Sequence, residues 1–365
     1  MKILLSSFHI VNEISGEYAQ AQELRKILEK IGYEVISGFP ELVKNNGEAF
    51  IQRAINCRNF AMQKQQTHKA DIIFLILPTP AFAFIADRIC KKFENVIVRY
   101  DASLSSEEIL NSPKGILSSP LFFTSRFFIN SMTAAKFSSF SAKYHIVSSQ
   151  YQRRELIKAG CKEERIVCIP NAVLLEDKRA KQKAENDRFC FGYAGHLFGI
   201  KGVDILIQAF ARFQQKNRNV KLKLFSSGLG NKSAIKKMIN KLDLRQNVEL
   251  HIAAIDWDSI DCMVLPYRYS FGTLAFPQLL LESLGKGCPV ITTNVRIIDE
   301  IITDKMTGLL AEPMNTVSLA DKMNEIFSDP VLREEISERG KKLFSKVFDI
   351  NVVSNSYKEL LNKLT

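Results

Sequence analysis

Residues 189–210 read FCFGYAGHLFGIKGVDILIQAF, and this stretch decides the fold class. The apolar run 189–193 has the length and composition of a buried strand, and glycines interrupt the pattern shortly after it. From Val203 onward, apolar residues recur at the spacing of one helix face. A strand, a glycine turn and a helix in this order predict a parallel α/β sheet.

The same alternation continues on both sides of this stretch. Short apolar runs predict strands over 3–5, 35–36, 72–77, 96–98, 146–147, 166–169, 220–225, 248–252, 262–265 and 289–292. Amphipathic segments predict helices over 15–32, 203–215, 232–242 and 277–285. The sequence therefore predicts an α/β protein with two Rossmann-like, doubly wound domains that face a cleft.

The domain boundaries follow from length and charge. A chain of 365 residues is long enough for two domains of similar size. The charged stretch 176–188 has few apolar residues and is interpreted as the linker between them. We expect a first domain at 1–175 and a second at 189–345, with a mostly helical tail that breaks near Asp329 and Pro330.

The net charge of the chain indicates which classes of partner to expect. Lysine and arginine number 50 against 39 aspartate and glutamate residues, which gives a net charge of +11. This excess attracts anions, so phosphorylated substrates, an anionic membrane surface and nucleic acid are candidates. No helix-turn-helix, RNP-like or zinc pattern accompanies the charge, so no nucleic-acid partner is expected.

The cysteines and the apolar stretches indicate a cytoplasmic protein. Seven cysteines form no CxxC pair and have no zinc spacing to histidines, so we expect reduced thiols, no bound metal and no other cofactor. Residues 1–7 lack the length of a secretory signal, so we expect the mature chain to begin there. The apolar stretch 72–86 is interrupted by two prolines and is too short to span a bilayer.

The first candidate site is the turn that contains Gly195, His196 and Lys201. It lies between the strand 189–193 and the helix opened by residues 199–204, at the strand end where open α/β sheets bind ligands. A helix N-terminus offers backbone N–H groups, and a lysine adds positive charge, so a phosphate would be stabilised there. A solvated lysine in a glycine-rich turn is the alternative interpretation, and the motif alone leaves both open.

The second candidate site spans 270–290, which read SFGTLAFPQLLLESLGKGCPV. Pro277 suits the first turn of a helix, and Gly287 suits its end. Glu282 stands among leucines, where a carboxylate is costly unless it has hydrogen-bond partners. A pair of ligand hydroxyls would supply them, and a solvated helix face is the alternative.

Taken together, these segments resemble the family 4 retaining glycosyltransferases of the GT-B fold, also called glycosyl transferases group 1. YAGHLFGIKGVDILIQAF at 193–210 is similar to the family's phosphate-binding motif, and LLLESLGKGCPVITT at 279–293 to its donor-site helix. IVCIPNAV at 166–173 resembles the strand and proline-asparagine turn that close its first domain. The resemblance covers 144–365, whereas before it only MKILLSS and Ser15-Gly16 match the opening strand and glycine loop.

The resemblance implies a nucleotide diphosphate sugar as donor. Lys201 and His196 would contact its diphosphate, and Glu282 would accept hydrogen bonds from its ribose hydroxyls. Gly16 would approach the phosphates from the first domain, and Gly195 would lie at the phosphate turn. The remaining donor-binding positions are consecutive: Gly272, Thr273, Leu274, Ala275 and Phe276.

The chain departs from the family pattern at three positions. His196 stands where an arginine is frequent, and imidazole neutralises less charge at neutral pH. Leu274 stands where the first of two family glutamates is expected, so the sugar is not defined by the resemblance. Asp101 lies where the family often has a catalytic histidine. With Lys201 and His196 it completes the candidate catalytic residues, although a turn aspartate is the commoner interpretation.

Residues 109–154 form a basic, aromatic stretch. They contain six lysines and arginines, no acidic residue and interleaved phenylalanines. Cationic and apolar faces together allow a helix to lie at a lipid interface, whereas core packing is the alternative. The sequence leaves both open, and the first predicts a peripheral site on the inner face of the cytoplasmic membrane.

The leading functional hypothesis is a retaining hexosyltransferase. It would move a sugar from a nucleotide diphosphate sugar to a glycan or lipid-linked acceptor in cell-surface polysaccharide or glycolipid assembly. The resemblance also implies that a helix at 346–365 returns to the first domain. A nucleotide-sugar epimerase and a catalytically impaired sugar-nucleotide-binding protein on the same fold are the alternatives.

Overall fold

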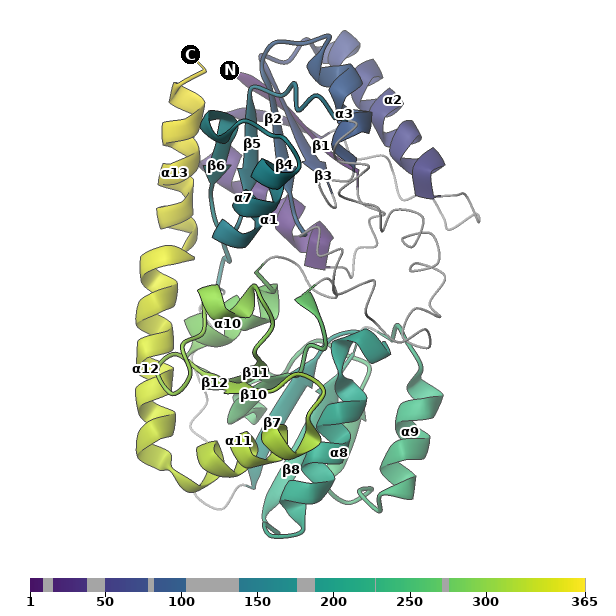
Figure 1. Ribbon diagram of the computed structural model, residues 1–365, viewed down its shortest axis with the longest axis vertical. Coiled ribbons are helices and arrows are strands. Elements are labelled where there is room, and N and C mark those ends of the chain that lie inside the picture. The colour runs from purple at the N-terminus through teal and green to yellow at the C-terminus, as the bar shows by residue number, and fades with distance from the viewer. Residues whose placement is uncertain are drawn as a thin grey trace. The chain divides into compact units, whose positions relative to one another are not determined.

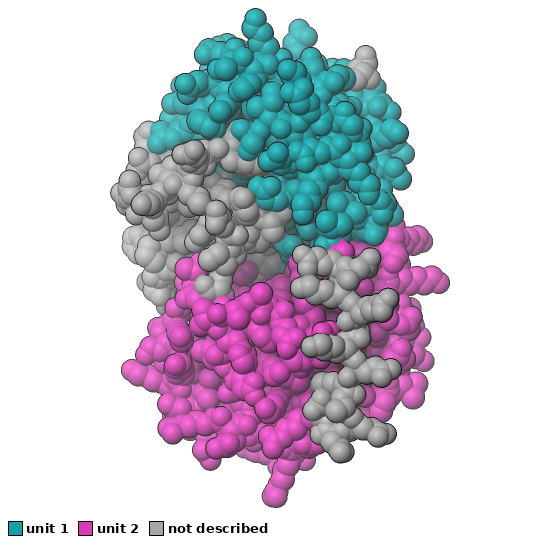
Figure 2. Space-filling model, turned by 180° about the vertical axis from the view of Figure 1, so that it is seen from behind, with its two compact units in different colours: residues 1–174, 274–278, 347–365 teal, residues 175–273, 279–346 magenta. Residues whose placement is uncertain are grey.

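The computed structural model describes residues 1–8, 16–37, 50–77, 82–102, 138–175, 188–226, 228–270 and 276–364. Two compact units make up the chain, and Figure 2 shows which residues belong to each. Unit 1 comprises residues 1–174, 274–278 and 347–365, and unit 2 comprises residues 175–273 and 279–346. Residues 176–187 of the expected linker lie outside the described residues.

Unit 1 contains a parallel sheet with the strand order β2-β1-β3-β4-β5-β6 (Figure 1). Its described strands are β1 (Lys2–Ser7), β2 (Glu34–Ser37), β3 (Ile72–Leu77), β4 (Val96–Tyr100), β5 (Tyr144–Val147) and β6 (Ile166–Cys168). Its described helices are α1 (Gly16–Lys30), α2 (Phe50–His68), α3 (Ala83–Cys90), α7 (Gln150–Lys158) and α13 (Ile350–Asn362).

The strands of unit 1 bury both faces. Ile3 and Leu5 of β1 belong to a core cluster with α1 and α13, whereas Leu4 between them belongs to a cluster with α2, α3 and α7. This alternation follows from the two-residue period of a strand. Helices therefore cover both faces of the sheet, as the doubly wound architecture requires.

Unit 2 contains a second parallel sheet, with the order β12-β11-β10-β7-β8-β9. Its described strands are β7 (Phe189–Ala194), β8 (Val220–Phe225), β9 (Val248–His251), β10 (Cys262–Leu265), β11 (Val290–Thr293) and β12 (Leu309–Ala311). Its described helices are α8 (Val203–Gln214), α9 (Lys232–Lys241), α10 (Gln278–Lys286), α11 (Thr316–Ser328) and α12 (Pro330–Val347), and the boundary residues Gln278 and Val347 count with unit 1.

The C-terminal helix belongs to unit 1. α13 packs against α1, and its Val353, Tyr357 and Leu361 are buried in the same core. The Val173 N–H group donates to the Phe348 carbonyl at 3.2 Å just before α13 begins. The helix that follows α12 thus packs on the sheet of the N-terminal half of the chain.

The fold class predicted from the sequence is confirmed. Both sheets are parallel, and each described unit alternates strands with helices. Within the described residues, no helix combines the length and the hydropathy needed to cross a membrane. All seven cysteines are free thiols.

Candidate functional site

The strand order of unit 2 marks where a ligand would bind. Numbered from β7 to β12, the strands are ordered 3-2-1-4-5-6, and the direction of winding reverses between β7 and β10. In open α/β sheets, ligands bind outside the carboxyl ends of the strands at this reversal. The segments that follow β7 and β10 are therefore the candidate site.

The turn after β7 is held by backbone hydrogen bonds. Gly195 has a φ of +145°, and its N–H group donates to the Phe225 carbonyl at 3.0 Å. Burial raises the pKa of Tyr193, whose hydroxyl donates to the His196 carbonyl at 2.8 Å. The backbone of His196 is thereby fixed, and its half-buried ring packs edge-on to Phe198.

The helix begins at Val203, where the predicted helix 203–215 also begins, but a separate turn precedes it. We expected residues 199–204 to open the helix, whereas Gly199–Lys201 form a separate 3-10 turn and α8 begins at Val203. The reason is Gly202, whose left-handed φ of +73° separates the two. Lys201 therefore precedes the helix N-terminus, where N–H groups without intrahelical partners are available to an anion.

The segment after β10 packs against this turn. The Lys201 Nζ atom lies 5.7 Å from the centroid of the Tyr267 ring, a cation–π contact. The Arg268 N–H group donates to the Ile200 carbonyl at 3.4 Å, and the Thr293 hydroxyl donates to the Tyr267 carbonyl at 2.5 Å. Backbone and ring contacts thus set the position of the half-buried Lys201.

Arg268 is a site residue that the sequence analysis missed. Its guanidinium forms an ion pair with Asp204, the second residue of α8. An acidic side chain at this position would oppose a bound anion, and the pairing neutralises it. The sequence did offer one signal for Arg268. It is a basic residue three positions after the end of the strand 262–265, at the strand end where ligands bind in such sheets.

Glu282 lies in the middle of α10. Leu280, Leu281 and Leu284 are buried on one side of this helix, whereas Glu282 is half-buried. Pro277 lies just before the helix rather than in its first turn, because α10 begins at Gln278. The predicted stop is confirmed, since Gly287 has a φ of +66° and the Cys288 N–H group donates to the Ser283 carbonyl.

Only some of the other predicted site residues lie in the part of the chain that the structure describes. Gly272, Thr273, Leu274 and Ala275 lie outside the described residues, and Phe276 is buried in unit 1. Gly16 is the first residue of α1, the helix that follows β1.

Asp101 directly follows β4 and is 1% exposed. Its carboxylate lies 3.5 Å from the Arg99 guanidinium. The structure therefore gives Asp101 a buried cationic neighbour, and its contact with an acceptor stays a prediction.

A metal ion would need several ligands close together in the part of the chain that the structure describes. There, no three histidine, cysteine, aspartate or glutamate side chains are grouped closely enough to hold an ion. Asp256 and Asp258 flank Trp257 in a short connection before β10. The Lys286 Nζ atom lies 5.7 Å from the centroid of the Trp257 ring between them, a cation–π contact.

A known family matches the part of the chain that holds this site. Residues 175–343 match the family model described as Glycosyl transferases group 1. The gpi3 subunit of phosphatidylinositol N-acetylglucosaminyltransferase from Schizosaccharomyces pombe is 28% identical over 170 residues, which are 45% of this chain and 37% of that protein. The capsular polysaccharide biosynthesis glycosyltransferase CapM from Staphylococcus aureus is 32% identical over 143 residues, which are 38% of this chain and 36% of that protein. The chain thus covers little more than a third of these curated relatives.

Solved structures match over the whole chain. Sucrose-phosphate synthase from Thermosynechococcus elongatus has a TM-score of 0.78 and 16% identity, covering 100% of this chain and 98% of that chain. Anabaena Alr3699/HepE, solved in complex with UDP, has a TM-score of 0.68 and 18% identity and covers 100% of both chains. At such identities the likeness defines the fold alone. The chain has the GT-B fold, and Lys201 and Glu282 lie within residues 175–343, which match the glycosyl transferases group 1 model.

Proposed function

We propose that this protein is a retaining glycosyltransferase that uses a nucleotide diphosphate sugar as donor. The observation that carries the proposal is the site at the reversal of the unit 2 sheet, where Lys201 precedes the N-terminus of α8 and contacts Tyr267. Positive charge and unpaired N–H groups at one strand end are suited to a diphosphate. The family match of the same residues supports this assignment.

The reaction builds up negative charge on the leaving group, and these residues would stabilise it. The bond between the anomeric carbon and the diphosphate oxygen breaks, and negative charge grows on the departing diphosphate. Lys201, His196 and the N-terminus of α8 would stabilise that charge. The acceptor oxygen bonds to the anomeric carbon on the same face, and its proton passes to the leaving phosphate oxygen. This route retains the configuration and needs no separate strong base.

The remaining site residues would bind and orient the substrates. Glu282 would accept hydrogen bonds from the ribose hydroxyls, and the backbone of 272–276 would surround the donor. Gly16, the first residue of α1, would contact the phosphates. Asp101 would contact an acceptor hydroxyl, and its pairing with Arg99 would hold its carboxylate in one orientation.

The partners of the relatives support the choice of substrates. One solved structure with this fold contains UDP, and the names of the two curated relatives mention phosphatidylinositol and capsular polysaccharide biosynthesis. We therefore propose a hexose donor and a glycan or lipid-linked acceptor in the assembly of a cell-surface polysaccharide or glycolipid. A cytoplasmic protein that binds the inner face of the membrane would reach such an acceptor.

A donor screen followed by product analysis tests the proposal. A panel of nucleotide sugars is added to the protein, and a donor at one hundred times its dissociation constant stabilises the fold by about 2.7 kcal/mol. The stabilising donor is then incubated without acceptor, and the released sugar is followed by proton NMR. The proposal predicts slow release of the nucleotide diphosphate and a first-formed sugar with the donor's anomeric configuration. A new epimer of the intact nucleotide sugar would instead establish an epimerase, and inversion would exclude a retaining enzyme.

A further inference from the structure

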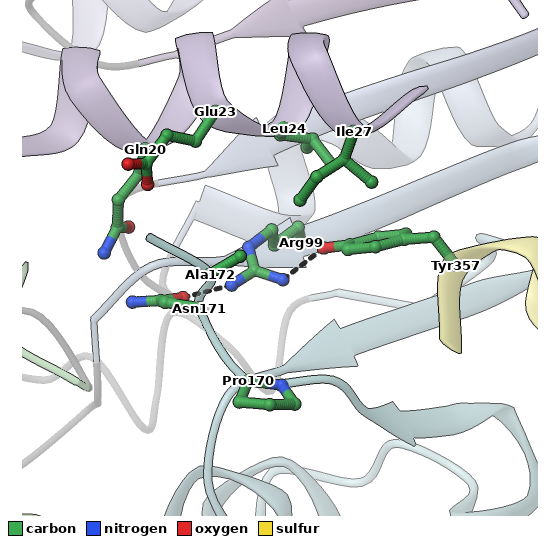
Figure 3. Close-up of a pocket in the computed structure, with 9 residues that line it drawn as sticks. All are labelled: Gln20, Glu23, Leu24, Ile27, Arg99, Pro170, Asn171, Ala172 and Tyr357. Atoms are coloured by element: carbon green, nitrogen blue, oxygen red, sulfur yellow. Dashed lines mark hydrogen bonds between the residues drawn. The ribbon is translucent and has the colours of Figure 1, made fainter. Parts of the chain in front are cut away.

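Asn171 lies at the centre of a buried hydrogen-bond network in unit 1. It follows β6 after Pro170 and is 4% exposed. Its side-chain oxygen accepts hydrogen bonds from the Arg99 guanidinium and from the Ser148 hydroxyl, the latter at 2.8 Å (Figure 3 draws the bond to Arg99). A guanidinium donates and never accepts, so the Asn171 oxygen must face Arg99. The amide nitrogen of Asn171 therefore points away from Arg99.

That nitrogen holds the backbone of Phe276. The Asn171 Nδ2 atom donates to the Phe276 carbonyl at 3.1 Å. The Phe276 ring is buried and packs edge-on against Phe348, with ring centroids 5.7 Å apart. Phe276 is thus fixed at its backbone by Asn171 and at its side chain by a separate contact.

The support for Asn171 is rigid because Arg99 is held from several elements. Its guanidinium donates to the Tyr357 hydroxyl of α13, to the Ile169 carbonyl at 3.3 Å and to the Ser148 hydroxyl at 3.0 Å (Figure 3 draws the Tyr357 bond). Arg99, Ser148 and Tyr357 are each at most 5% exposed. A buried network in which each member is satisfied fixes one geometry.

The place of Phe276 in the chain gives this contact its function. Phe276 directly follows residues 272–275, which the proposed function assigns to the donor, and lies two residues before α10, which carries Glu282. Pro277 between them has a restricted φ, so an orientation fixed at Phe276 is transmitted to the start of the helix.

We propose that Asn171 is a positioning residue for the donor site. It holds the Phe276 carbonyl and thereby fixes the chain two residues before α10 begins. The inference rests on the proposed function, because α10 matters to the reaction only if Glu282 binds the donor. Asn171 acts through Phe276 and is not itself a catalytic residue.

Asn171→Asp is the informative substitution. The aspartate keeps an oxygen for Arg99 and Ser148, but its second oxygen replaces the N–H donor that faces the Phe276 carbonyl. The network in unit 1 therefore stays assembled while Phe276 loses its hydrogen bond. Alanine is less suitable, because an adjacent pocket of about 20 Å³, room for about one water molecule, would enlarge and admit solvent.

Ser148→Ala is the matched control. It removes the hydrogen bond from Ser148 to the same Asn171 oxygen and the one from Arg99 to Ser148, and it leaves the contact with Phe276 in place. Both variants should lower the melting temperature of the protein. Affinity for the nucleotide separates them, since only Asn171→Asp changes the contact that precedes α10.

The experiment measures the dissociation constants of UDP and GDP by calorimetry for the wild type and both variants. For the nucleotide that the wild type binds, we expect Asn171→Asp to weaken binding about tenfold and Ser148→Ala to change it less than about twofold. Equal weakening in both variants, or none in Asn171→Asp, would overturn the positioning role while leaving the proposed function intact. A wild type that binds neither nucleotide nor any sugar donor would overturn both.

Discussion

The carbonyl oxygen of Pro266 lies 1.9 Å from the position that a Cβ atom would take on Gly202. The backbone after β10 thus approaches the Lys201 turn so closely that no side chain fits between them. Gly202 also has a left-handed φ of +73°, which L-residues with a side chain rarely adopt. Two independent constraints therefore require glycine at the residue that separates Lys201 from α8.

We expect Gly202→Ala to lower the free energy of unfolding by at least about 2 kcal/mol, because the left-handed conformation and the displaced Pro266 backbone both carry a cost. Nucleotide binding should weaken as well, since the turn must move. Chemical denaturation and calorimetry measure the two effects. Gly199→Ala is the matched control, because a Cβ atom there meets nothing within 4 Å. Similar losses in both variants would contradict the packing argument.

Lys201→Ala should weaken binding of the nucleotide diphosphate by about 10-fold to 100-fold, the range for a lost hydrogen bond to a charged group. The melting temperature should change little, because the lysine is half-buried and lies in a turn outside the core. Lys236→Ala, on the exposed face of α9, controls for the general loss of positive charge. Equal effects of the two substitutions would reduce the role of Lys201 to long-range attraction.

Glu282→Gln should weaken nucleotide binding about tenfold, because an amide oxygen accepts hydrogen bonds less strongly than a carboxylate. The ribose assignment is tested by comparing UDP with 2′-deoxy-UDP. The wild type should lose affinity when the hydroxyl is removed, and the variant should lose much less. Glu334→Gln, at an exposed position of α12, is the control. An unchanged preference for UDP in Glu282→Gln would exclude the ribose contact.

Local sequence patterns predicted the strands and helices around the site well. The strand at 262–265 and the helix stop at Gly287 follow from apolar runs and glycine chemistry, and both are present in the structure. The three-residue strand β12 was missed, because so short a run has no periodicity of its own.

Contacts distant in sequence could not be predicted in this way. The strand order of each sheet, the pairing of Arg268 with Asp204 and the bond from Asn171 to Phe276 depend on tertiary packing. The burial of Asp101 beside Arg99 belongs to the same class, since no local pattern distinguishes a turn aspartate from a buried one.

Acid should destabilise the protein through His145. The ring is 1% exposed, with Nδ1 2.9 Å from the Tyr100 hydroxyl oxygen and Nε2 3.2 Å from the Phe140 carbonyl oxygen. Burial lowers the pKa of His145 to about 4. In the unfolded chain the pKa is about 6.5, so the unfolded state binds the proton first as the pH falls.

The contribution of neutral His145 is therefore complete above pH ~6.5 and is lost between about 6.5 and 4, amounting to about 3 kcal/mol. Urea denaturation at several pH values across this window measures the loss. His145→Gln should be less stable at neutral pH. The slope of its unfolding free energy against pH should be smaller than in the wild type, because about one proton fewer is taken up on unfolding. The same slope in both proteins would assign the acid sensitivity to other groups.

The basic stretch 109–154 should bind anionic membranes. Residues 103–137 lie outside the described residues, whereas Lys143 is exposed before β5. Salt screens surface charge over about 8 Å at physiological ionic strength, so binding to vesicles of phosphatidylglycerol should weaken as salt rises. Phosphatidylcholine vesicles should bind poorly throughout. Lys136→Glu combined with Lys143→Glu should reduce flotation with anionic vesicles.

Lys236→Glu combined with Lys237→Glu changes the net charge equally at two exposed positions of α9 in unit 2, and it should reduce flotation less. Equal reductions would point to net charge alone, and no preference for anionic lipid at low salt would exclude the membrane surface.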